Sequence, residues 1–156
     1  MNQRAHNSPN IVLLRGAALW LLMALLLAWC MVGLNFDVHF LKAIFLGKQT
    51  RLVQAHIDFL LMTALILGFY AARIPLHWSV RWAMVLGAFG NSSIFLLESI
   101  FPVLESADPV DGSFLTLFQY YAMGSVSTTT YGFGAAAITV LWSTFRPAPS
   151  ADVLEK

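Results

Sequence analysis

The chain has 156 residues, of which 58% are hydrophobic and only 11% charged, with a net charge of +1 and a mean hydropathy of +0.71. Soluble domains carry about 25% charged residues, and a chain of this length has too little interior to bury so much apolar surface. The composition excludes an ordinary soluble domain, and the scattered Lys and Arg residues exclude a nucleic-acid-binding stripe. The single cysteine, Cys30, excludes an intrachain disulfide.

Four apolar segments are long enough to cross about 30 Å of hydrocarbon as helices. They are residues 16–34, 52–74, 80–102 and 114–145. The last segment is long for an upright span, so we expect it to tilt or to extend beyond the membrane. Short connections make neighbouring helices antiparallel, which predicts an all-α integral membrane four-helix bundle within residues 11–146. The polar ends, residues 1–10 and 147–156, are predicted to be disordered tails.

The distribution of positive charge predicts the orientation in the membrane. Six basic residues lie on the side of the two termini and the middle connection: Arg4, Arg15, Arg73, Arg81, Arg146 and Lys156. Three lie on the opposite side: Lys42, Lys48 and Arg51. Basic loops stay in the cytoplasm, so we expect both ends of the chain to be cytoplasmic and the protein to reside in the inner membrane.

Ionisable residues within apolar spans are unfavourable and therefore mark candidate functional sites. The antiparallel order places one set of polar side chains at a similar depth near the outer face: His56, Asp58, Glu98, Gln119, Tyr120 and Tyr121. Asn91, Phe95 and Glu98 follow an i, i+4, i+7 spacing and share one face of the third span. His56 is the most versatile, because imidazole can ligate a metal or move a proton near neutral pH. The alternative is that these groups simply reach headgroup water or form an aromatic belt.

The fourth span carries a second polar patch of hydroxyl and small residues: Ser125, Ser127, Thr128, Thr129, Thr130, Tyr131, Gly132 and Gly134. Hydroxyls within a helix can bond back to the preceding turn and need no other partner. Small residues also permit close contact between helices. We therefore interpret the patch as a helix-packing surface, with a polar pathway as the alternative.

Three short motifs resemble the styrene oxide isomerases, small four-span bacterial membrane proteins that bind haem b and rearrange an aryl epoxide to an aldehyde. An Ala-His pair, Ala55-His56, opens the second span, and Asn91 with an apolar turn before Pro102 closes the third. Gly112-Ser113-Phe114-Leu115, followed by Tyr120, opens the fourth. The resemblance covers about residues 52–142. It implies bound haem b, with His56 as the axial iron ligand, and assembly as a homo-oligomer of the trimer type.

Two positions depart from the pattern of that family. Met62 and Phe95 stand where the family has an Asn and a Tyr that contact the epoxide, and neither can donate a hydrogen bond. The resemblance then implies that another residue positions the oxygen. The catalytic candidates are Asn91, Tyr120, Tyr121 and Glu98. The candidates for the substrate pocket are Asp58, Met62, Phe95 and Gln119.

The expected function is a haem-dependent isomerase that opens a lipophilic epoxide by Lewis-acid catalysis within the bilayer. Two alternatives remain open from the residues. One is a haem or non-haem metal protein without isomerase activity, since carboxylates at Asp58 and Glu98 beside His56 would suit iron, zinc or manganese. The other is a non-enzymatic transport or assembly subunit that uses the polar layer as a solute or proton path.

Overall fold

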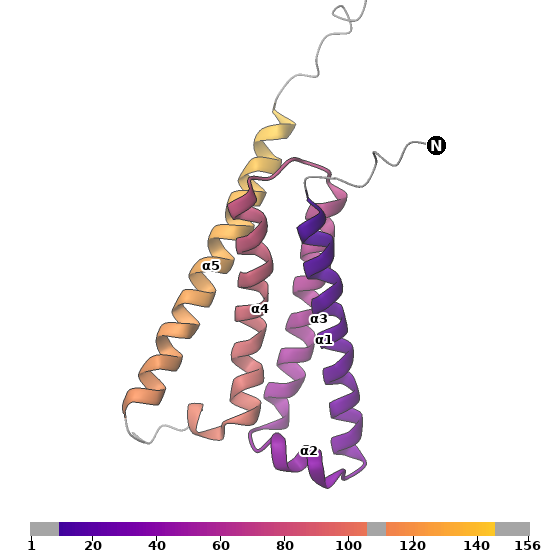
Figure 1. The fold of residues 1–156 in the computed structure, drawn as a ribbon, viewed down its shortest axis with the longest axis vertical. Helices are drawn as coiled ribbons and strands as arrows, with labels where there is room; N and C mark the ends of the chain where they lie inside the picture. The colour runs from indigo at the N-terminus through magenta and orange to yellow at the C-terminus, as the bar shows by residue number, and fades with distance from the viewer. Residues whose placement is uncertain (1–9, 106–111, 146–156) are drawn as a thin grey trace, which may run out of the picture.

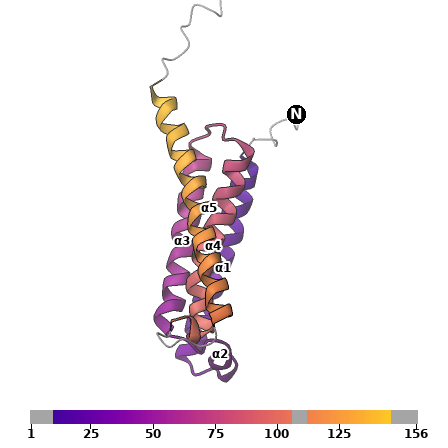
Figure 2. The ribbon, with the colours of Figure 1, turned by 90° about the vertical axis from the view of Figure 1, so that its left-hand side faces the viewer.

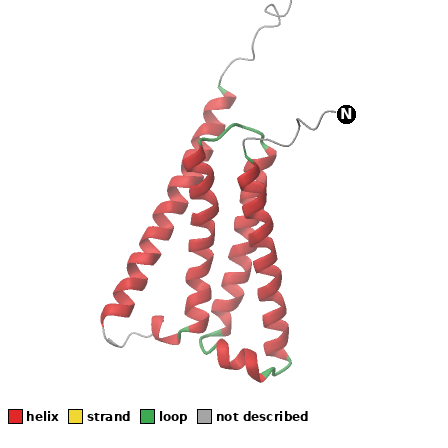
Figure 3. Ribbon diagram, viewed as in Figure 1, coloured by secondary structure: helices red, strands yellow, loops and turns green. Residues whose placement is uncertain are grey.

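The computed structural model describes residues 10–105 and 112–145, and within them it contains helices and loops but no strand (Figure 3). The elements are α1 (Ile11–Asn35), α2 (His39–Ile44), α3 (Gln49–Ala71), α4 (Trp78–Ile100), the 3-10 helix η1 (Pro102–Leu104) and α5 (Gly112–Thr144). The long helices alternate in direction, so that α1 begins and α5 ends at the same end of the molecule (Figure 1). The predicted all-α class is confirmed for this part of the chain. Arg4, Arg146, Lys156 and the two predicted tails, apart from residue 10, lie outside the described residues.

Three helices, α1, α3 and α4, are long and apolar enough to cross a membrane. They expose large apolar side chains, such as Leu22 and Trp29, which are 63% and 73% accessible. A surface of this kind suits lipid and not water. The protein is therefore a multi-pass helical membrane protein. The helix α5 is longer, but it does not join this group, because hydroxyls and glycines interrupt its apolar character between Ser125 and Gly134.

Proline and backbone geometry set two helix ends. The second predicted span runs to residue 74, whereas α3 ends at Ala71. Arg73 adopts a left-handed conformation with φ of 55°, and Pro75 disfavours a helical conformation in the residue before it. The third predicted span runs to residue 102, but α4 ends at Ile100 and Pro102 opens η1 instead.

Two hydrogen bonds join segments that lie far apart in the sequence. Asn10, which the sequence placed in a disordered tail, is buried and donates its Nδ2 to the carbonyl of Ile74 at 2.8 Å. The backbone N–H of Gly47 donates to the carbonyl of Ser99 at 2.9 Å. A Cβ at Gly47 would lie only 2.3 Å from the carbonyl oxygen of Glu98, so glycine permits this close approach. The connection before α3 is thereby held against the end of α4.

The helices α1, α3 and α4 pack around one another, whereas α5 packs along α4 (Figures 1 and 2). In the three-helix group, the Trp20 ring stacks on Phe89 with centroids 4.9 Å apart, and its Nε1 donates to the carbonyl of Val85 at 3.1 Å. A contact between Phe69 and Phe133 joins α5 to the end of α3. Within residues 10–105 and 112–145, α5 therefore packs mainly on α4, and one buried cluster contains residues of all four long helices.

Small residues allow α4 and α5 to approach closely. The facing residues are Gly87 and Gly90 on α4 and Ser125, Thr129 and Gly132 on α5. A Cβ at Gly132 would lie 2.6 Å from the backbone nitrogen of Met84. A Cβ at Gly87 would lie 2.7 Å from backbone atoms of Thr129. The predicted helix-packing role is confirmed for these three residues of α5, whereas Gly134 would have open space at its Cβ.

Candidate functional site

Asp58 belongs to α3, and its side chain accepts two hydrogen bonds from residues of α4. Asn91 Nδ2 donates to its Oδ2 at 2.9 Å, and Ser92 Oγ donates to the same oxygen at 2.8 Å. Ser92 also has the carbonyl of Ala88 within reach at 3.0 Å, so its single hydrogen has two acceptors to choose from. Asp58 is half-buried, and these donors supply the partners that a carboxylate within a span requires.

His56 faces α1 instead of α4. Its Nδ1 lies 2.8 Å from the carbonyl oxygen of Ala24. A carbonyl can only accept, so Nδ1 carries the hydrogen, and in the neutral ring Nε2 keeps a free lone pair. Histidines that bind metals commonly have one ring nitrogen held in this way by a backbone carbonyl or a carboxylate. The half-buried imidazole of His56 is therefore oriented, and one ligating nitrogen is available.

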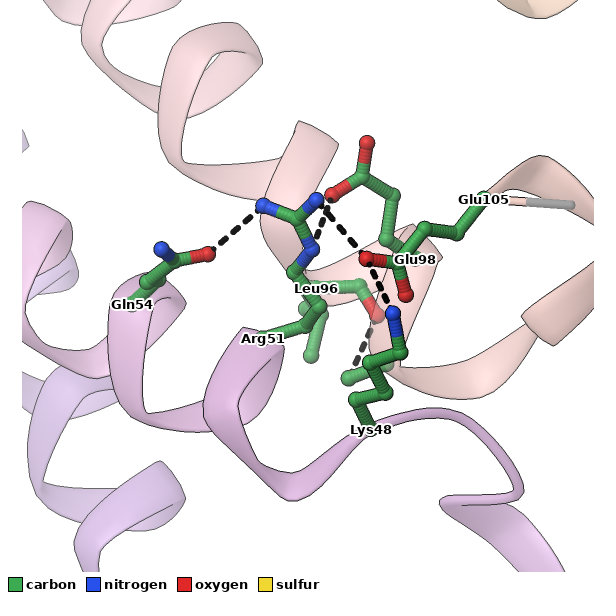
Figure 4. A network of polar contacts seen from close by, with 7 residues as sticks. Lys48, Arg51, Gln54, Leu96, Glu98 and Glu105 are labelled. Atoms are coloured by element: carbon green, nitrogen blue, oxygen red, sulfur yellow. Dashed lines mark hydrogen bonds and ion pairs between the residues drawn. The ribbon is translucent and has the colours of Figure 1, made fainter. Parts of the chain in front are cut away.

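Glu98 belongs to a charged network where α3 begins and α4 ends (Figure 4). Arg51 Nε lies 3.1 Å from Glu98 Oε2, although the buried Oε2 receives no hydrogen bond of good geometry. Arg51 Nη2 and Lys48 Nζ lie 3.0 and 2.9 Å from Glu105 Oε1. The hydrogen bond from Lys48, with further help from Arg51, lowers the pKa of Glu105 below its usual range. Glu98 thus lies in a network that joins two helix ends.

The two tyrosines at the start of α5 differ in their surroundings. The Tyr121 hydroxyl lies 2.5 Å from Ser93 Oγ on α4. Tyr120 is 72% accessible, and Gln119 is also exposed. Met62 and Phe95, two residues predicted to line a substrate pocket, are apolar packing residues in the structure. Met62 is buried in a cluster shared by all four long helices, and the half-buried Phe95 packs against the cluster around Phe59.

The predicted polar layer therefore divides into separate contacts. The structure brings Asp58 and Asn91 together, but it places His56 against α1, Glu98 against Arg51 and Tyr121 against Ser93. Within the described part of the chain, no three His, Cys, Asp or Glu residues gather as a group that could hold a metal ion. A mixed site built from His56, Asp58 and Glu98 is not assembled in this chain.

Three side-chain partners in these contacts were not predicted from the sequence: Arg51, Ser92 and Ser93. Ser92 and Ser93 directly follow Asn91, but hydroxyls in helices often bond back, so their presence alone indicated no partner. Arg51 carried a clearer signal, because the predicted topology already placed it on the same side of the membrane as Glu98. A basic and an acidic residue at one depth are expected to pair.

Comparisons of the chain with protein-family models, with curated proteins and with solved structures found no match.

Proposed function

We propose that this chain is a four-span inner-membrane protein with cytoplasmic ends that binds haem b through His56 and isomerises a lipophilic epoxide. The observation that carries the proposal is the hydrogen bond from His56 Nδ1 to the Ala24 carbonyl, which leaves Nε2 free as a ligand. The start of α1 and the end of α5 at one end of the molecule support an even number of crossings. The 33 residues of α5 extend about 50 Å, which is ample for a tilted fourth span.

The residues around His56 suit haem as well as its iron. An oriented neutral imidazole is a common axial ligand for haem iron. The neighbouring side chains of Ile57 and Leu60 on α3 are apolar and are 56% and 37% accessible. Such side chains would hold the apolar macrocycle, while His56 Nε2 would hold the iron.

When bound, ferric haem supplies a Lewis acid for the epoxide oxygen. The chain contributes a setting with little water, in which hydrolysis to a diol would be suppressed. Asn91 already donates its Nδ2 to Asp58, and the two tyrosines lie on α5, which packs mainly on α4. The proposal includes the homo-oligomer of the trimer type that the resemblance implies, in which a hydroxyl such as that of Tyr120 would come from a neighbouring copy.

The first test is an absorption spectrum of the detergent-purified protein beside the variants His56→Ala and His39→Ala. His39 is an exposed residue of α2 and serves as the matched control. We expect a Soret band in the parent and in His39→Ala, and its loss in His56→Ala with unchanged helical circular dichroism. A parent expressed with ample haem that shows no Soret band would refute haem binding. A band retained by His56→Ala would refute the assignment of the ligand.

The second test addresses the reaction. Haem-loaded protein is incubated with aryl and terpene epoxides, and carbonyl products are measured by gas chromatography. We expect an aldehyde or ketone to form with the parent and with His39→Ala but not with His56→Ala. Haem binding without any carbonyl product would leave a haem protein without isomerase activity.

A further inference from the structure

A groove of about 410 Å³ runs along the contact between the middle of α4 and the first half of α5. Glycine at two lining positions keeps it open, since a Cβ at Gly124 would meet no atom within 4 Å and Gly90 has no side chain to fill the space. Other lining residues are Leu86, Phe89, Ser125 and Thr128. The volume falls within the range of about 300–1,000 Å³ for small-molecule sites.

The hydroxyl of Ser125 is buried in this groove without a partner. Ser125 is only 8% accessible, yet its Oγ has no hydrogen-bond partner among residues 10–105 and 112–145. The Oγ lies over Gly90, where an added Cβ would approach it to 2.6 Å. The absent side chain of Gly90 therefore makes room for an unpaired hydroxyl in the wall of the groove.

The neighbouring hydroxyls behave differently. Thr128 and Thr129 donate to the carbonyls of Gly124 and Ser125, each at 2.8 Å, as hydroxyls within a helix commonly do. The Tyr121 hydroxyl, on another lining residue, pairs with Ser93. Ser125 makes no bond back to the preceding turn, so its hydrogen is available to a molecule in the groove.

The depth of Ser125 excludes water and lipid headgroups as its partners. Gly90, beside it, lies twelve residues after the start of α4 at Trp78 and ten before its end at Ile100. At a rise of 1.5 Å per residue these lengths are about 18 and 15 Å, which is the middle of a hydrocarbon layer about 30 Å thick. Acyl chains offer no acceptor at this depth. A buried donor without a partner is unfavourable, so an occupant that supplies an acceptor is favoured over an acyl chain.

We propose that this groove binds a lipophilic small molecule that carries one hydrogen-bond-accepting oxygen, such as a ketone, with Ser125 Oγ as the donor. Leu86 and Phe89 supply apolar walls, and the two glycines let the oxygen of the ligand approach the hydroxyl closely. Such a molecule dissolves in the bilayer and reaches the groove from the side. The site uses neither His56 nor haem, so its test is independent of the proposed isomerase.

The occupant is tested with benzophenone, a lipophilic ketone that inserts into nearby C–H bonds when irradiated. Purified protein in detergent is labelled, digested and mapped by mass spectrometry. We expect saturable labelling within residues 86–90 and 120–128, in the parent and equally in His56→Ala. Labelling that is spread over all helices or does not saturate would overturn the proposal. Absence of labelling in these two segments, as when an acyl chain or a second copy fills the groove, would overturn it as well.

The role of Ser125 is tested by competition against benzophenone with cyclohexyl methyl ketone and its hydrocarbon isostere isopropenylcyclohexane. The ratio of the two competitor constants is compared between the parent and Ser125→Ala, which cancels the partition of the competitors into micelles. We expect Ser125→Ala to reduce the preference for the ketone about fivefold, the effect of one neutral hydrogen bond.

Ser127→Ala is the matched control, because Ser127 is an exposed serine of the same helix that does not line the groove. We expect this control to keep the preference of the parent, and both variants to keep the helical circular dichroism. A preference for the ketone that Ser125→Ala leaves unchanged, or that Ser127→Ala reduces equally, would overturn the donor role.

Discussion

Replacing Gly132 by Ala tests how closely α4 and α5 approach each other. The new Cβ would lie 2.6 Å from the backbone nitrogen of Met84 and 2.8 Å from the carbonyl carbon of Ala83. Ordinary contacts begin at 3.4 Å, so the backbones must separate by about 0.8 Å. No flexible side-chain end is among these nearest atoms, so the adjustment falls on the helices themselves. Overpacking of this kind costs about 1–3 kcal/mol.

Gly134 on the same helix provides the matched control, because a Cβ there would meet no atom within 4 Å. Both changes to Ala gain about 0.5–1 kcal/mol of helix propensity, so the difference between the variants isolates packing. We expect Gly132→Ala to be less stable than Gly134→Ala by about 1–3 kcal/mol.

The assay is unfolding in mixed micelles by titration with sodium dodecyl sulfate, followed by circular dichroism. Gly87→Ala on α4 should lower the free energy of unfolding as Gly132→Ala does, since its Cβ would lie 2.7 Å from backbone atoms of Thr129. Equal unfolding free energies for Gly132→Ala and Gly134→Ala would refute the close approach of the two helices.

The remaining predictions concern the carboxylates. Asp58→Ala removes the acceptor for Asn91 Nδ2 and should lower the free energy of unfolding by about 1–2 kcal/mol in the same titration. Asp58→Asn keeps an acceptor oxygen and should lower it less. Equal losses of unfolding free energy in the two variants would contradict the assigned hydrogen bonds. The pKa of Glu105 is lowered mainly by Lys48, so its stabilising effect is complete above the ordinary value of 4.5 and is lost as pH falls through the lower pKa of the folded state. Glu105→Gln should therefore show a smaller acid-induced drop in the unfolding midpoint than the parent. An equal drop in the parent and in Glu105→Gln would contradict the ion pairs.

The sequence was sufficient to predict the four long helices, because long apolar segments have one stable form in lipid, whereas the short helices α2 and η1 were not predicted. The predicted helix ends were less accurate at positions where a single residue ends the helix. The left-handed Arg73, for example, stops α3 before the apolar run is over. The predicted role of Thr129 and Gly132 in packing also followed from residue type, since small side chains are what allow helices to approach.

The partners of the polar residues were harder to predict, because depth in the membrane says nothing about direction around a helix. His56 and Asp58 are close in depth, but at about 100° per residue they point to different neighbours. One meets α1 and the other meets α4. The rotation of each helix is set by packing contacts between residues far apart in the sequence, as between Gly16 and Val85.

The attachment of α5 to α4 implies an order of biosynthesis. Residues such as Ser125 and Thr129 make the middle of α5 a weak signal for entry into lipid, and the structure covers them with the small-residue face of α4. On the four-span proposal, α5 would enter the bilayer beside an α4 that is already in place. The first three spans would then act as an internal chaperone for the last. A change that damages this face of α4 would be seen as failed insertion of α5 during synthesis.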